Sequence, residues 1–181
     1  MSTNQLGISG SAGPTNTAII ICTEHGRLEK QSLLLVMSLR LFGGAFSGLP
    51  VYSFAPRSGH APSAKTLRLF DFLNVTHETI PLNVQYADYP LANKPIVCDY
   101  AQHALSENQL VFIDSDQIIY NEPTLLFNLP DNTVVVKPVD VKGIGTESLD
   151  DSVYWKQIYK LFNLTPTEYV RSTIDKKEIL A

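Results

Sequence analysis

One short stretch, Gln109-Leu-Val-Phe-Ile-Asp-Ser-Asp116, constrains the fold of this chain more than any other. Its apolar run, Leu110 to Ile113, is typical of a strand buried on both faces of a parallel sheet. The run ends abruptly in two acids separated by Ser115. Side chains alternate along a strand, so Asp114 and Asp116 are expected to point to one face. The sequence therefore predicts two carboxylates at the carboxyl end of a central strand, where open α/β folds bind ligands.

Two neighbouring carboxylates repel each other unless a cation or hydrogen-bond donors share their site. Hard oxygen ligands of this kind suit Mg²⁺ or Mn²⁺, which can also bridge to substrate phosphates. We therefore predict a metal site at Asp114 and Asp116. The alternative is that both acids only cap a turn before Gln117.

Composition limits the class of protein. A chain of 181 residues with 44% apolar and 18% charged residues is expected to form one folded domain with a substantial core. The net charge of −4 gives no electrostatic reason to expect binding to nucleic acid or to an anionic membrane. Phosphate binding would have to come from a local cluster of side chains or from a metal.

The cysteines, the N-terminal sequence and the length of the apolar stretches indicate the cellular compartment of the protein. Cys22 and Cys98 fall in an apolar strand run and in a predicted helix, which favours buried, reduced thiols in a cytoplasmic protein. The first residues lack the pattern of a signal peptide, and no apolar stretch is long enough to span a bilayer.

Strand and helix patterns alternate along the chain. Residues 1–16 are rich in Ser, Gly, Asn and Thr, which indicates a flexible tail, and 166–181 are expected to form a C-terminal helix or tail. Pro81 indicates that the third strand lies at an edge of the sheet or ends early, and Ser63 is a candidate helix cap. The alternation predicts a three-layer α/β/α sandwich with a mainly parallel sheet over residues 17–165. Strands are predicted at 17–22, 50–54, 77–82, 110–113 and 133–136, and helices at 28–42, 64–73, 95–105 and 152–162.

Four segments together suggest a family: TAIIICTEHGRLE, PVYSFAPR, YPLANKP and LVFIDSDQIIYNEP. Over residues 17–140 the chain resembles the GT-A fold of nucleotide-diphospho-sugar glycosyltransferases, which have a Rossmann-like sheet. In that family an Asp-X-Asp (DXD) motif holds a divalent metal against the donor diphosphate. The resemblance implies a Mn²⁺- or Mg²⁺-dependent glycosyltransferase that uses a nucleotide-diphospho-sugar, with a UDP-sugar preferred because it is frequent in the family. The acceptor is unknown, and a homo-oligomer is a further possibility.

The resemblance also assigns roles at the acidic motif and before it. Asp116 would bind the metal directly, and Asp114 would contact the ribose or the water shell of the metal. Asn93 and Lys94 match the family's polar contacts to donor sugar and phosphate, and the helix N-terminus there adds backbone donors. Asn93 has the alternative of capping the helix that begins near Pro95. Lys94 can pair with phosphate or with the acids themselves.

Further assignments follow the first two strands. Thr23, Glu24 and His25 lie where the family's first loop meets the nucleoside. Arg57 would contact the base or a phosphate, because its fork of donors suits either. The alternatives are that His25 bonds the backbone of its own turn and that Arg57 pairs with a carboxylate.

The chain also departs from the family pattern. Members often have a late His that completes the metal shell, whereas all four histidines here precede Asp114. The catalytic base is not identifiable, with Glu122, Asp140 and Glu147 as candidates. The chain is therefore expected to be a short or truncated member of the family. Two alternatives stay open: a non-catalytic protein that binds nucleotide-sugar and metal, and a nucleotidyltransferase, whose Gly-rich signature residues 22–27 match poorly.

Overall fold

The computed structural model describes residues 16–127, 152–165, 169–174 and 176–180. The chain divides into two compact units, Met1–Leu129 and Pro130–Ala181, and the predicted domain over residues 17–165 stays a prediction. The predicted strand at 133–136 and the candidate bases Asp140 and Glu147 lie outside the described residues.

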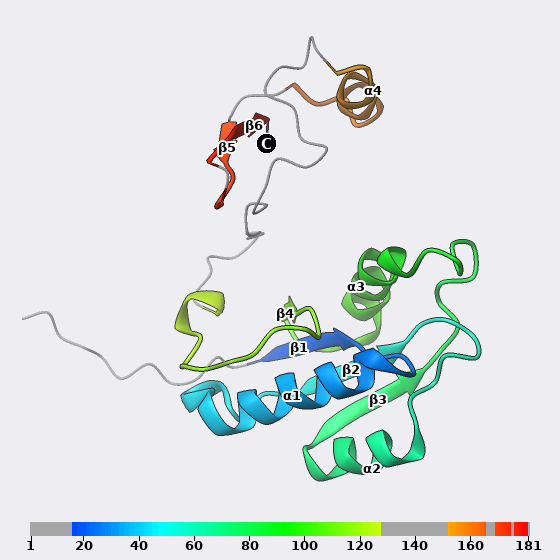
Figure 1. The fold of residues 1–181 in the computed structure, drawn as a ribbon, viewed down its shortest axis with the longest axis vertical. Helices are drawn as coiled ribbons and strands as arrows, with labels where there is room; N and C mark the ends of the chain where they lie inside the picture. The colour runs from blue at the N-terminus through cyan, green and yellow to red at the C-terminus, as the bar shows by residue number, and fades with distance from the viewer. Residues whose placement is uncertain (1–15, 128–151, 166–168, 175, 181) are drawn as a thin grey trace, which may run out of the picture. The chain divides into compact units, whose positions relative to one another are not determined.

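A four-stranded parallel sheet forms the centre of the first unit (Figure 1). The strand order is β3-β2-β1-β4. The strands are β1 (Thr17–Cys22), β2 (Val51–Ala55), β3 (Val75–Thr79) and β4 (Gln109–Phe112). β1 has its predicted bounds, because its five residues from Thr17 to Ile21 are all buried and its apolar run is continuous.

The edges of this sheet are β3 and β4. Within the described sheet, β3 is an edge strand and also ends early, at Thr79 before Pro81, so both alternatives for the third strand hold. The prediction of a central, doubly buried strand before the acidic motif is wrong for the described sheet, since β4 pairs there with β1 alone and its four side chains are only half-buried. Strand order depends on the crossover through the preceding helix, which the local pattern of residues 109–112 does not encode.

Helices cover both faces of the sheet (Figure 1). α1 (Arg27–Phe42) and α2 (Ala64–Phe72) cover one face, where Leu35, Val36 and Phe70 pack in one apolar cluster with strand residues. α3 (Asn93–Ala104) covers the other face through Val97 and Ala101. The three-layer α/β/α architecture is therefore confirmed.

Two polar clamps tie α1 to α2 at both ends. At the amino ends, Glu29 Oε2 accepts hydrogen bonds from Ser63 N (2.8 Å), Ser63 Oγ (2.6 Å) and Thr66 Oγ1 (2.5 Å). Ser63 also caps α2 as predicted, accepting a bond from Thr66 N. At the carboxyl ends, the Arg40 guanidinium donates to four backbone carbonyls, those of Ser47, Leu49, Leu73 and Asn74. The two helices are thus fixed to each other by hydrogen bonds as well as by packing.

After β4 the chain returns along α1. Ile119 N donates to Ser38 Oγ (2.9 Å), and the Phe127 ring stacks on Phe46 with centroids 4.3 Å apart. Glu122 Oε2 accepts from Ala45 N (2.9 Å), and a Cβ at Gly44, whose φ is 56°, would collide with this carboxylate. This return path carries Glu122 to the segment that precedes β2, at the amino end of the sheet.

The second unit contains α4 (Val153–Leu161), β5 (Tyr169–Arg171) and β6 (Glu178–Leu180). Ser152 caps α4, accepting from Trp155 N at 3.2 Å. β5 and β6 pair antiparallel, so the predicted C-terminal helix or tail is wrong for these residues. The pairing places Val170 opposite Ile179, which is buried. Among the helices that the structure describes, none has the length and apolar character needed to cross a membrane.

Candidate functional site

Most of the predicted site residues lie at the carboxyl end of the parallel sheet, where its strands end. We call this end of the sheet the carboxyl edge, as distinct from the lateral edge strands β3 and β4. β1, β2 and β4 end there, so the segments after Cys22, Ala55 and Phe112 meet at one edge. α3 runs back toward the start of β4, so its first turn lies at the same edge. Parallel topology alone therefore brings together residues from four separate parts of the sequence.

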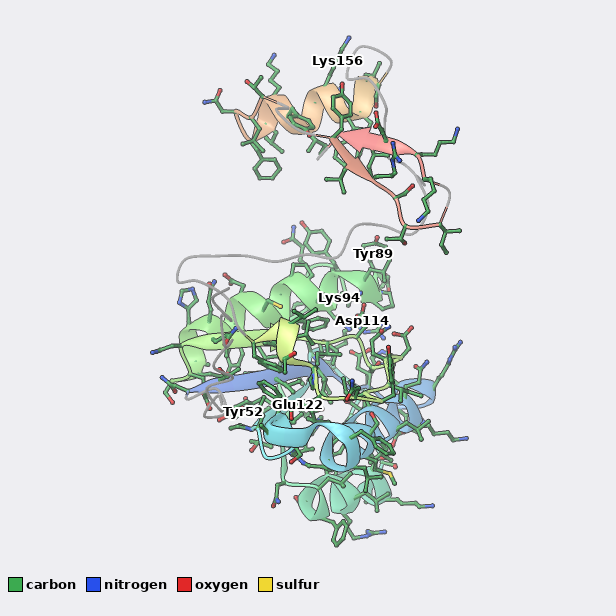
Figure 2. The ribbon with its side chains drawn as sticks, turned by 90° about the vertical axis from the view of Figure 1, so that its left-hand side faces the viewer. Tyr52, Tyr89, Lys94, Asp114, Glu122 and Lys156 are labelled. Carbon is green, nitrogen blue, oxygen red and sulfur yellow. The ribbon has the colours of Figure 1, made fainter. Side chains whose placement is uncertain are left out.

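Lys94 and Asp114 form an ion pair at this edge. The Nζ of Lys94 lies 2.7 Å from both Oδ1 and Oδ2 of Asp114, and the two side chains are 44% and 45% exposed. Figure 2 shows the pair between the start of α3 and the end of β4, with Glu122 apart from it. The alternative that Lys94 pairs with the acids themselves is thus confirmed, and both groups remain open to solvent.

Asp116 lies in a turn beyond the strand. Gln117 N donates to the Asp114 carbonyl oxygen (3.1 Å), which closes the turn that the alternative interpretation predicts. Ser115 is buried between two less buried acids, and Asp116 is exposed. The Asp116 Oδ1 accepts a long bond of 3.3 Å from Gln117 Nε2. The Asp116 carboxylate therefore faces water, and the long bond from Gln117 competes only weakly with a ligand for its oxygens.

Asp114 and Asp116 are the residues at this edge that could hold a divalent metal. Within the described residues, no group of three or more His, Cys, Asp or Glu side chains is placed to hold a metal ion. Mg²⁺ and Mn²⁺ do not require such a cage, because they keep several waters and take one or two carboxylates plus substrate phosphates. Asp116 and Asp114 can supply those carboxylates, although Lys94 occupies both oxygens of Asp114.

Glu24 and Arg57 form a second, more buried ion pair. The Nε of Arg57 lies 3.0 Å from both oxygens of Glu24, and its Nη2 lies 2.6 Å from Oε2. The hydrogen bonds to Glu24 raise the pKa of Arg57, against the effect of burial. Nη1 donates to the Ala87 carbonyl oxygen (3.0 Å). The alternative that Arg57 pairs with a carboxylate is thus confirmed, and its contact with a donor stays a prediction.

Thr23 and His25 differ in their surroundings. Thr23 is fully buried and donates to Ser32 Oγ (2.7 Å). His25 is exposed, and its Nδ1 lies 3.2 Å from Glu29 Oε1. Burial raises the pKa of Glu29, but hydrogen bonds from Ser63, Thr66 and the backbone outweigh it and lower the pKa to about 2. His25 is the member of the first loop that can reach a ligand from solvent.

Asn93 is buried and does not cap α3, whose first residue it is. Its Oδ1 accepts from Asn83 Nδ2 (2.8 Å), and Asn83 Oδ1 accepts from Tyr86 N (3.2 Å). Asn83 was not among the predicted residues, because no local pattern marks a bond to a helix ten residues away. The pair holds the loop that carries Tyr86 and Tyr89, both exposed, near the carboxyl edge (Figure 2).

The cysteines lie under this edge and are free. Burial, followed by the charge of Glu24, raises the pKa of the Cys22 thiol to about 12, and burial raises that of Cys98. Both thiols are therefore protonated near neutral pH, although both residues are half-buried rather than buried as predicted.

Hollows elsewhere on the first unit are separate from this edge. One of about 400 Å³ lies at the amino end of the sheet, beside Glu107, whose Oε1 accepts from Tyr52 OH (2.9 Å). Another of about 440 Å³ lies along α3. Glu122 is also at the amino end, so it cannot act on a group bound at Asp114 and Asp116.

A family model independently identifies the chain. The model, described as the Rhodobacterales glycosyltransferase domain, matches residues 19–180 and so includes both units. No curated protein sequence is similar enough to match. The described fold, an α/β sandwich with a parallel sheet, agrees with such a domain. The chain therefore belongs to the Rhodobacterales glycosyltransferase domain family.

Proposed function

We propose that the chain transfers a sugar from a nucleotide-diphospho-sugar to an acceptor, as a metal-dependent glycosyltransferase of GT-A type. Membership of the family implies a sugar donor and an acceptor. The proposed metal is Mn²⁺ or Mg²⁺, and the preferred donor is a UDP-sugar.

The observation that carries the proposal is the Lys94–Asp114 pair beside the exposed Asp116. A cation and two carboxylates at one open edge match the needs of a diphosphate with its divalent counter-ion. The first turn of α3 adds backbone N–H groups and the positive end of the helix dipole at the same edge.

Each residue would then have a distinct part in binding. Asp116 would be the primary metal ligand, because Asp114 is already paired. Lys94 would turn from Asp114 to a phosphate oxygen of the donor, which frees Asp114 for the ribose or for the metal's water shell. A bound metal would neutralise charge on the leaving nucleoside diphosphate. The half-exposed state of Lys94 and Asp114 supports this exchange of partners, since neither side chain is locked by burial.

The test is calorimetric titration of the full chain with UDP and GDP, in Mn²⁺ and then in EDTA. We expect binding that requires the metal. Asp116→Asn should weaken it by on the order of tenfold or more, because a metal-bridging carboxylate is lost. Asp99→Asn is the matched control, since Asp99 is an exposed acid of α3 whose distance to His103 is 4.0 Å. Equal affinity in EDTA, or in the Asp116 variant, would contradict the metal site.

Two activity assays separate the alternatives. Release of UDP or GDP from the matching nucleotide-sugar indicates glycosyl transfer or donor hydrolysis. Release of pyrophosphate from a nucleoside triphosphate and a sugar phosphate indicates a nucleotidyltransferase. Metal-dependent binding without either product would leave a binding protein.

A further inference from the structure

The outward side of the α1–α2 layer exposes large apolar side chains. On α1 these are Leu34, Met37 and Leu41, of which Leu41 is 71% exposed. On α2 they are Leu69 and Phe72, the latter 83% exposed. We call these five residues the apolar stripe.

Helical spacing places the stripe on one surface. Leu34, Met37 and Leu41 are three and four residues apart, so they share one side of α1, opposite Leu35 and Leu39 in the core. α2 presents Phe72 outward while Phe70 packs inward. The Glu29 and Arg40 clamps fix the two helices side by side. The stripe is therefore a property of a rigid two-helix layer.

The charges around the stripe are nearly all positive. Four cations on these helices are exposed: Arg27, Lys30, Lys65 and Arg68. The helices contain two acids, of which Glu29 is buried in its clamp and Asp71 is exposed. The exposed formal charge of the layer is thus +3, on a chain whose net charge is −4. The whole-chain charge conceals this local excess.

We infer that this face docks the protein on an anionic lipid bilayer. Cationic and apolar side chains mixed on one helical surface suit the boundary between headgroups and acyl chains. The most exposed apolar groups, Leu41 and Phe72, project into solvent. Projecting side chains suit insertion into a fluid layer, which needs no matching pocket, and the cations complement negative headgroups. The inference is independent of the proposed donor site.

The test is flotation of the full chain with vesicles of phosphatidylcholine alone and with about 30% phosphatidylglycerol. We expect association with the anionic vesicles, and weaker association as salt is raised. Lys65→Gln with Arg68→Gln should weaken partitioning roughly 25-fold, since each cation near the surface contributes about fivefold. Leu41→Ser with Phe72→Ser should weaken it by on the order of tenfold.

The control variants change residues outside α1 and α2. Leu125→Ser removes an equally exposed apolar group, and Lys160→Gln removes an exposed cation of the second unit. Neither should change partitioning, and circular dichroism should confirm that all variants are folded. No binding to anionic vesicles by the folded wild type would overturn the inference. So would binding that Leu125→Ser and the Leu41–Phe72 variant alter equally, or capture by an acidic protein without lipid association.

Discussion

The Lys94 ammonium contacts both carboxylate oxygens of Asp114, so it occupies the place that a metal would need on Asp114, and Asp114 occupies the place that a phosphate would need on Lys94. The pair joins the first turn of α3 to the residues that follow β4. Its two side chains are half-exposed, and their interaction is worth less than about 1 kcal/mol. This weak pairing makes the exchange of partners testable.

Lys94→Met is expected to tighten Mn²⁺ binding in the absence of nucleotide, because Asp114 is freed for the ion. The same change should weaken nucleotide binding in Mn²⁺, because the phosphates lose a cation. Electron paramagnetic resonance of free Mn²⁺ measures the first effect, and calorimetry the second. Lys160→Met is the control. Lys94→Met should change the free energy of unfolding by less than about 1 kcal/mol. Weaker Mn²⁺ binding by the variant alone would argue against competition.

Glu29 predicts a pH dependence of stability. Its pKa is about 2 in the folded chain, below the ordinary value of 4.5. A lowered pKa stabilises the fold at pH values above 4.5, and this contribution is lost as pH falls toward 2. Glu29→Gln should therefore lower the free energy of unfolding by roughly 3 kcal/mol near neutral pH, with a smaller difference in acid. Urea unfolding across this range measures it. A difference for Glu29→Gln that stays constant from neutral pH into acid would contradict the assignment.

The Glu24–Arg57 pair predicts a larger cost, because it is buried. Arg57→Met leaves the Glu24 carboxylate without its partner, which should lower the free energy of unfolding by about 3–5 kcal/mol. It also removes the bond to Ala87, so chymotrypsin should cut faster at Tyr86 and Tyr89. Arg171→Met is the control, because its pair with Glu178 is exposed on both sides. Equal effects of the two variants would show that burial does not strengthen the first pair.

The raised pKa values of the cysteine thiols predict that they react slowly with thiol reagents in the folded chain. With a pKa of about 12, Cys22 holds only about one thiolate in ten thousand at pH 8. Ellman's reagent should therefore label the folded chain far more slowly than the chain in urea. Cys22→Ser and Cys98→Ser assign the two rates. Rapid labelling of Cys22 in the folded chain would place that thiol nearer the solvent than the described packing allows.

Features set by neighbouring residues were predictable from the sequence. Ser63 and Ser152 cap their helices because the bonded amide lies three residues away in each case. The acidic turn and its position at the carboxyl edge followed from the local pattern and from parallel topology. A bond between Lys94 and the acids was one of two interpretations, since opposite charges were expected at the same edge.

Features set by distant residues were not predictable. Glu24 and Arg57 are 33 residues apart, and only the alignment of β1 with β2 shows that their loops meet. The edge position of β4 in the described sheet likewise depends on which segments meet in space. The charge excess of the α1–α2 layer also required the burial of Glu29 to be known, because the sequence alone counts that acid against the cations.

The two clamps between α1 and α2 have a consequence for how the first unit opens. Neither helix can unwind fully without breaking the bonds that Glu29 or Arg40 makes to the other helix or its flanking turns. The backbone amides of the two helices should therefore become available to solvent deuterium in the same rare event. Their exchange would then report one opening free energy, shared across a stretch of sequence that includes β2.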